Sequence, residues 1–184
     1  ISNESYIKFE VIYPDGNRNV FKNFNELLDD LKNKNLEGKH NIILRDDYSL
    51  TEQEIQKLKE YKTTSNQIFD IQSLDEDYMK KPYSLKSKVK KVYFPMEVHI
   101  SNISYDIENT YLEGEKNSIG DFVEKSNASS LNSIYLVPKK DVNSTNEVSI
   151  KSGSWKKVVG AYSETKTENY HNGSINISIS DGDI

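Results

Sequence analysis

Lysine is the residue type whose spacing most clearly suggests chemistry in this chain of 184 residues. Six lysines lie between residues 80 and 91, and a tyrosine lies within the same stretch and another just after it. Closely spaced ammonium groups attract anionic polymers, anionic lipid surfaces or single-stranded nucleic acid, and aromatic rings add contact area. The sequence therefore predicts a binding site for a polyanion or a partner, formed by Lys80, Lys81, Tyr83, Lys86, Lys88, Lys90, Lys91 and Tyr93.

The spacing inside this lysine cluster has two interpretations. If residues 85–94 form one strand, Lys86, Lys88 and Lys90 point to the same face, because alternate side chains of a strand share a face. Such a row can bind an anionic ligand. It can also protect an edge strand against pairing with another chain, which is a common use of lysine in sheets. Both interpretations stay open from the sequence.

Acidic residues follow two of the expected strands. Asp46–Asp47 come directly after the apolar run 42–44, and Asp75–Asp77 come after the run 67–71. Because the carboxyl ends of parallel strands meet at one edge of a sheet, the two groups can lie close together. Carboxylate oxygens suit a hard cation such as Ca²⁺. No EF-hand spacing is present, so solvated loop acids are the other interpretation and no metal ligand is assigned.

The sequence lacks the residues that most other catalytic mechanisms require. The absence of cysteine excludes thiol nucleophiles, disulfides and thiolate metal sites. His40, His99 and His171 form no HExxH or HxH pattern, and no GxSxG elbow or glycine-rich phosphate loop is present. We therefore expect no catalytic residue and no cofactor, which favours a protein that is not an enzyme. An enzyme that uses two carboxylates alone remains an alternative.

The first half of the chain is predicted to form an α/β layer. Asn23 and Thr51 each precede a glutamate by three positions, the pattern of a capping box at the start of a helix. Apolar residues then recur at helical spacing in both segments, so two amphipathic helices are expected. Aromatic and β-branched runs predict strands at residues 6–13, 20–21, 40–44 and 67–71.

The second half is predicted to be rich in strands. Candidate strands cover residues 85–94, 96–107, 133–137, 147–150, 155–162 and 174–180, and one short helix is expected at residues 119–125. In the last of these, isoleucine alternates with serine and asparagine, which is typical of a strand with one wet face. The charge changes from acidic at Asp75–Asp77 to basic at Lys80–Lys81, next to Pro82, which indicates a boundary between the halves.

The predicted fold class is therefore α+β. A small N-terminal α/β layer with two helices and three to four strands is expected over residues 1–78. A β-rich meander or sandwich-like half is expected over residues 79–184, and the two can pack as one unit.

The composition limits the class of partner. Of 24 basic residues only Arg18 and Arg45 are arginine, so the chain has little capacity for the bidentate contacts that read guanine. Sequence-specific binding of nucleic acid is therefore not expected. No stretch approaches the roughly 20 apolar residues of a transmembrane helix.

The function expected from these observations is binding rather than catalysis. We expect an extracellular module, secreted or attached to the surface of a bacterium with an AT-rich genome, that binds a polymer or a protein through Tyr- and Lys-rich strand surfaces. A leader peptide upstream of Ile1 would support export. An intracellular acidic protein of the immunity or inhibitor type is an alternative, since residues 1–80 carry 16 acidic and 11 basic residues. A carboxylate-only hydrolase is a second alternative.

Overall fold

The computed structural model describes residues 6–73, 81–122, 131–138, 145–163, 174–180 and 182–183. Within these residues the chain forms two helices and otherwise mostly strands, and the sheets are largely parallel. The expectation of two helices in the first half of a β-rich chain is confirmed at this coarse level. The short helix expected at residues 119–125 is wrong over its described part, because Lys116–Ile119 is a strand and residues 120–122 are not helical. The connectivity of the strands differs from the expectation, as described below.

Eight strands form the largest sheet, named here the long sheet, in the order β16-β13-β11-β8-β5-β3-β1-β2. Only β1 pairs with its neighbours in antiparallel fashion, as the hairpin partner of β2 and beside β3. The strands of the long sheet are β1 (Phe9–Ile12), β2 (Arg18–Phe21), β3 (Gly38–Leu44), β5 (Gln67–Ser73), β8 (Glu97–Ser101), β11 (Lys116–Ile119), β13 (Thr145–Ile150) and β16 (Ser174–Ile179).

Shorter strands form the other faces of the molecule. A four-stranded parallel sheet has the order β15-β12-β10-β7, a three-stranded sheet has the order β4-β6-β9, and β14 pairs with β17. Their bounds are β4 (Tyr48–Leu50), β6 (Ser84–Ser87), β7 (Lys91–Phe94), β9 (Ser104–Asp106), β10 (Asn109–Leu112), β12 (Ser133–Leu136), β14 (Gly153–Ser154), β15 (Lys157–Val159) and β17 (Gly182–Asp183).

Both helices begin where the sequence predicts. The Asn23 side chain accepts a hydrogen bond from the Glu26 amide at 2.8 Å and starts α1 (Phe24–Lys34). Thr51 and Glu54 form a complete capping box at the start of α2 (Glu52–Lys59). Each helix buries its apolar stripe, and Asn35, in the left-handed region at φ 49°, ends α1.

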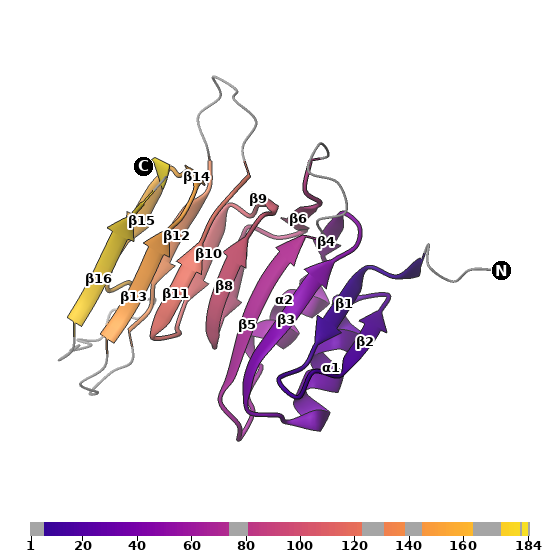
Figure 1. Ribbon diagram of the computed structural model, residues 1–184. Helices are drawn as coiled ribbons and strands as arrows, with labels where there is room; N and C mark the ends of the chain where they lie inside the picture. Colours follow the sequence, from indigo (N-terminus) through magenta and orange to yellow (C-terminus); the bar gives the residue numbers. More distant parts are fainter. Residues whose placement is uncertain are drawn as a thin grey trace.

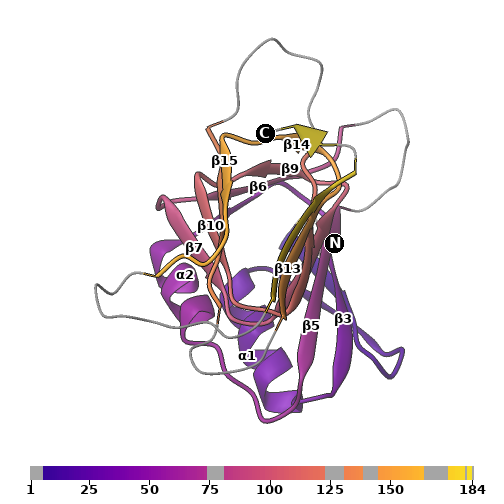
Figure 2. The same cartoon turned by 90° about the vertical axis from the view of Figure 1, so that its left-hand side faces the viewer.

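The chain runs as a coil with three faces (Figure 1). A strand of the long sheet is followed by a strand of the three-stranded sheet and then by one of the four-stranded sheet, as in β5-β6-β7 and β8-β9-β10. The coil that begins with β3 has α2 in the place of the third strand, and α2 lies beside β7 in Figure 2. Successive coils stack, which makes the strands of each face parallel.

The prediction of a meander or sandwich-like second half is therefore wrong. Consecutive strands do not pair with each other, because each one ends at a corner and the chain continues on another face. The expected strand 85–94 is two strands, β6 and β7, on different sheets, and the segment 96–107 likewise divides into β8 and β9. The long sheet contains strands from both sides of residue 78.

The core lies inside the coil and is built from rows of side chains that cross the strands. One row of the long sheet consists of isoleucines that are paired in register from strand to strand: Ile42, Ile71, Ile100, Ile119, Ile150 and Ile179. The first five are buried, and Ile179, on the last strand, is exposed. This row was not recognised in the sequence because its members pair across coils of unequal length. Stacked identical side chains fill the interior evenly, as in other solenoids.

Candidate functional site

The structure separates the residues of the predicted lysine cluster. Lys86 lies on β6 in the three-stranded sheet, whereas Lys91 and Tyr93 lie on β7 in the four-stranded sheet. Lys88 and Lys90 occupy the corner between the two strands. The single row of Lys86, Lys88 and Lys90 is therefore wrong, and Lys80 falls outside the described residues.

The corner after β6 has a local physical cause. The Ser87 hydroxyl accepts a hydrogen bond from the Val89 amide at 3.1 Å and also donates to the Val89 carbonyl, which closes a tight turn. Val89 is partly buried and packs against the core, so its apolar side chain supports the turn. The predicted alternation stops here because the backbone leaves the extended conformation.

Lys81 and Tyr83 line a small open pocket of about 400 Å³, together with Asp47, Ser84, Ser104 and Phe122. The Asp47 carboxylate accepts a hydrogen bond from the Ser84 amide at 2.8 Å, so it fixes the start of β6. Lys81 and Tyr83 thus lie near Asp47, whose carboxylate already has a structural role.

A stack of tyrosines covers the outer face of the four-stranded sheet. Tyr93, Tyr111 and Tyr135 occupy equivalent positions on β7, β10 and β12. Their ring centroids lie 4.4 Å and 4.7 Å apart, with 12° between the planes in each pair. Tyr162 leans against Tyr111 and Tyr135 at 5.1 Å and 5.0 Å. This tyrosine stack, Tyr93, Tyr111 and Tyr135, is buried as a cluster separate from the main core.

Three lysines hold their ammonium groups over this stack. The Nζ atoms of Lys59, Lys91 and Lys157 lie 4.5, 6.0 and 5.5 Å from the ring centroids of Tyr93, Tyr111 and Tyr135, respectively. All three lysines are exposed residues, and none forms an ion pair with an acid in the part of the chain that the structure describes. Attraction between each cation and the ring below it is worth about 0.5–1 kcal/mol at such exposed sites.

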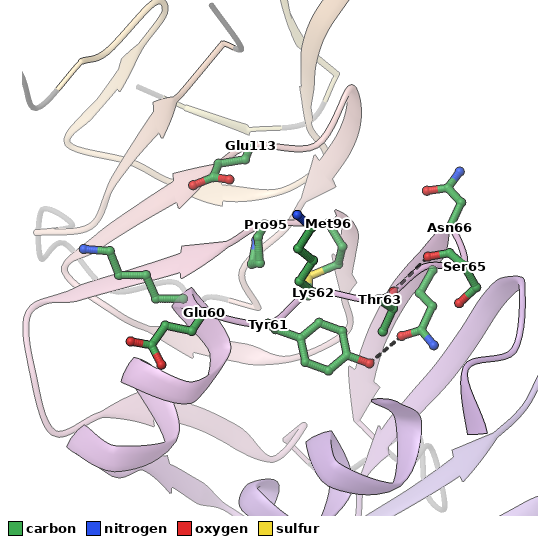
Figure 3. A pocket seen from close by; sticks show the side chains of 11 residues that line it. Glu60, Tyr61, Lys62, Thr63, Ser65, Asn66, Pro95, Met96 and Glu113 are labelled. Atoms are coloured by element: carbon green, nitrogen blue, oxygen red, sulfur yellow. Dashed lines mark hydrogen bonds between the residues drawn. The ribbon is translucent and has the colours of Figure 1, made fainter. Parts of the chain in front are cut away.

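Lys59, which lies over Tyr93, also lines an open pocket of about 430 Å³. The pocket lies between the end of α2 and the carboxyl ends of β7 and β10. Figure 3 shows its side chains, with Glu60 and Tyr61 on one side and Pro95, Met96 and Glu113 on the other. The Tyr61 hydroxyl donates to the Gln67 side chain at 2.5 Å, so this ring is fixed in place.

The environment of the stack favours the neutral form of its central tyrosine, Tyr111. Burial, together with the Tyr162 and Tyr135 side chains, raises the pKa of Tyr111 to about 12. The Tyr135 hydroxyl donates to the Asn109 side chain at 3.1 Å, and the Tyr93 hydroxyl is buried without a partner among the described residues. The positive charge of the lysines on this face is therefore not offset by phenolate groups near neutral pH.

The acidic groups that suggested a cation site either form other contacts or fall outside the described residues. Asp46 forms an ion pair with Lys8, whose hydrogen bond lowers the pKa of the Asp46 carboxyl. Asp75–Asp77 fall outside the described residues. The described part of the chain contains no group of three or more histidine or acidic side chains arranged to hold a metal ion.

His99 is part of a hydrogen-bonded chain on the outer face of the long sheet. Its Nδ1 lies 2.7 Å from the Ser118 hydroxyl and its Nε2 lies 3.0 Å from a Glu97 carboxylate oxygen. Ser118, His99 and Glu97 are thus connected in the same order as the nucleophile, base and acid of a catalytic triad. However, β8 and β11 are paired on both sides, so their backbone amides are committed to the sheet and cannot stabilise an oxyanion. The contacts are consistent with a satisfied surface histidine.

The other two histidines add no site. His40 is buried, its Nδ1 lies 3.0 Å from the Gly38 carbonyl oxygen, and burial lowers its pKa. His171 falls outside the described residues.

The tyrosine stack and the three lysines above it, Lys59, Lys91 and Lys157, form a surface named here the tyrosine–lysine face. The sequence predicted only two of its members, Lys91 and Tyr93. A signal was present, because a tyrosine between a β-branched residue and a large apolar residue recurs at 92–94, 110–112 and 134–136. The irregular distance between these tripeptides hides the repeat. The members missed are Lys59, Tyr111, Tyr135 and Lys157, and Tyr162, which packs against the stack, was missed as well.

No protein-family model, curated protein sequence or solved structure matches the chain. Neither described helix has the length and apolar character needed to cross a bilayer. The function is accordingly argued from the geometry of the tyrosine–lysine face.

Proposed function

We propose that this chain is a non-enzymatic binding module that works outside the cell, secreted or attached to the cell surface, and holds an anionic polymer. The binding surface in this proposal is the tyrosine–lysine face, which consists of the tyrosine stack and Lys59, Lys91 and Lys157. The composition supports the extracellular location in one respect, because a chain without cysteine has no thiol to oxidise outside the cell.

The observation that carries the proposal is the charge of the three lysines. An ammonium group with no acidic partner among the described residues can take an anionic group of a ligand without first breaking an ion pair. The ring under each lysine also limits the freedom of the side chain, which reduces the entropy lost on binding. Lys91 and Lys157 begin β7 and β15, the two outer strands of this sheet, so the charges are spread across its width.

The chemistry of the face favours a flexible polyanion over a base-reading interaction. Lysine binds phosphate, sulfate or carboxylate as a point charge, without the planar geometry of arginine. The stacked tyrosines are buried against each other, so they are not free to receive the bases of a nucleic acid strand. A polymer with repeated negative charges meets these conditions.

Substitution of the three lysines tests the proposal. Lys59→Ser, Lys91→Ser and Lys157→Ser combined should weaken binding of poly(glycerol phosphate) by about tenfold or more, since each exposed charge pair contributes up to about 1 kcal/mol. The dissociation constant can be measured by titration calorimetry at low salt and at about 0.15 M salt, where screening should reduce the difference between the two proteins.

Lys86→Ser with Lys88→Ser is the matched control, because these exposed lysines belong to the same sequence cluster but lie away from the stack. The control should bind like the wild-type chain. If the control loses affinity and the triple variant does not, the lysine cluster of the sequence binds the polymer and the tyrosine–lysine face does not. If the wild-type chain does not bind the polymer, the proposal of a polyanion ligand is wrong.

A further inference from the structure

The two edges of the long sheet differ in their protection against pairing with another strand. At one edge, β2 carries Arg18, which forms an ion pair with Glu10 at 3.1 Å. At the other edge, β16 and the following Ser180 contain no charged residue, no proline and no glycine. Figure 1 shows β16 at one end of the sheet and β2 at the other. Natural edge strands usually carry such protective residues, so the unprotected β16 is a candidate for strand pairing.

β16 also continues two apolar rows of the core and leaves their ends exposed. Ile179 is in register with the buried Ile150, and Ile177 with the buried Val148. Nevertheless Ile179 is 48% exposed and Ile177 is 40% exposed. These side chains point to the inside of the coil, where the neighbouring strand buries its equivalents. They are exposed because β16 is the last strand of the long sheet.

We propose that β16 pairs in antiparallel fashion with β16 of a second copy of this chain, across a two-fold axis at Ile177. Ile177 then faces Ile177 of the second copy, and Ile175 faces Ile179. A two-fold axis perpendicular to the sheet keeps the inner faces of both copies on the same side. The isoleucines of the two strands therefore form one apolar row, and Asn176 lies opposite Ser178 on the outer side.

The charge pattern favours a second copy as the occupant of this edge. At a two-fold axis the central residues meet their own equivalents, so any charged residue there would repel itself. β16 meets this condition at Ile177, and its other five residues add no charge that a second copy would have to match. At the β2 edge, Arg18 is a charged residue that pairing with another strand would have to accommodate.

Sedimentation equilibrium of the full chain tests the association. The wild-type mass should rise with concentration from that of one chain toward twice that value. Ile177→Lys should remain monomeric, because it places two ammonium groups at the axis. The matched control is Val20→Lys on β2, an exposed position at the opposite edge, which should associate like the wild-type chain.

Single cysteines test the register, and the cysteine-free chain makes each of them the only thiol. Directly opposed residues of antiparallel strands have Cα atoms about 4.5–5.5 Å apart, which permits a disulfide. Ile177→Cys should therefore form a covalent dimer under mild oxidation. Ile175→Cys should not, because its own equivalent lies four residues away, about 13 Å along the strand. Ile175→Cys with Ile179→Cys should cross-link again.

Two outcomes would overturn this inference. A wild-type chain that stays monomeric at every concentration, with no covalent dimer of Ile177→Cys, would show that the edge does not pair with itself. A dimer that cross-links through Ile175→Cys but not through Ile177→Cys would exclude the register with the two-fold axis at Ile177. Neither outcome bears on the tyrosine–lysine face, which lies on a different sheet.

Discussion

Asp121 is a carboxylic acid whose pKa is raised by its buried environment. Asp121 lies between β9, the edge strand of the three-stranded sheet, and the β14–β17 pair. Its carboxylate accepts a hydrogen bond from the Tyr105 amide on β9 at 2.8 Å. Gly153 lies against its side chain, and a Cβ there would approach the Asp121 Cβ to 2.7 Å. Burial raises the pKa of Asp121 to about 6, and the charge of Asp106 adds to the shift.

The raised pKa predicts a definite pH dependence. The contribution of Asp121 to stability is fully present below its unfolded pKa of 3.8 and is lost as the pH rises through the folded pKa of about 6. Asp121→Asn removes the buried charge but keeps an oxygen that can accept the Tyr105 hydrogen bond. The variant should therefore melt about 2 °C or more above the wild-type chain at pH 7.5.

Melting curves across a pH series separate this effect from other titrations. The two proteins should melt at the same temperature near pH 3.5, where both side chains are neutral, because groups such as His40 act equally in both. A variant that melts below the wild-type chain at pH 7.5 would mean that the ionised carboxylate is stabilised in the folded state.

At the scale of the element, the tyrosine stack should be a main support of the four-stranded sheet. Tyr111 lies between two parallel rings on the neighbouring strands. Tyr111→Ala removes both ring contacts and leaves a cavity, so it should lower the free energy of unfolding by about 3–5 kcal/mol. Tyr111→Phe keeps the ring and should cost about 1 kcal/mol.

Urea unfolding measures these changes. Tyr6→Ala is the control, because Tyr6 is 67% exposed and its loss should change stability by less than about 0.5 kcal/mol. If Tyr111→Ala is as mild as the control, the stack does not hold the sheet together.

The elements that were predictable from the sequence are those with local causes. The capping residues Asn23 and Thr51 act within one turn of their helices, so both helices begin where expected. The β1–β2 hairpin also follows from a short turn. The faces of the coil depend on contacts between distant residues, such as Tyr111 with Tyr135, and no local pattern fixes that pairing.

The candidate site shows the same limit. Lys91 and Tyr93 were found because they lie in a dense cluster of sequence, but the turn at Ser87 sends Lys86 to another face. Lys59 and Lys157 join the face only through the stacking of coils. Composition predicted the kinds of residues on this surface, whereas topology decides which of them meet.

For the whole molecule, binding of an anionic polymer requires a positive face on a chain whose net charge is −5. An anionic polymer approaching this chain is repelled on average and attracted only where lysines lack acidic neighbours. Binding should therefore be localised on one face and should weaken as salt screens the attraction.

Lysine footprinting of the complete chain measures this localisation most directly. Acetylation would be followed by mass spectrometry at every lysine, with and without poly(glycerol phosphate). If the polymer binds the tyrosine–lysine face, Lys59, Lys91 and Lys157 should become protected by it while Lys86 and Lys88 stay reactive. Protection at Lys86 and Lys88 alone, or equal protection of lysines over the whole surface, would contradict the claim that the tyrosine–lysine face is the binding site.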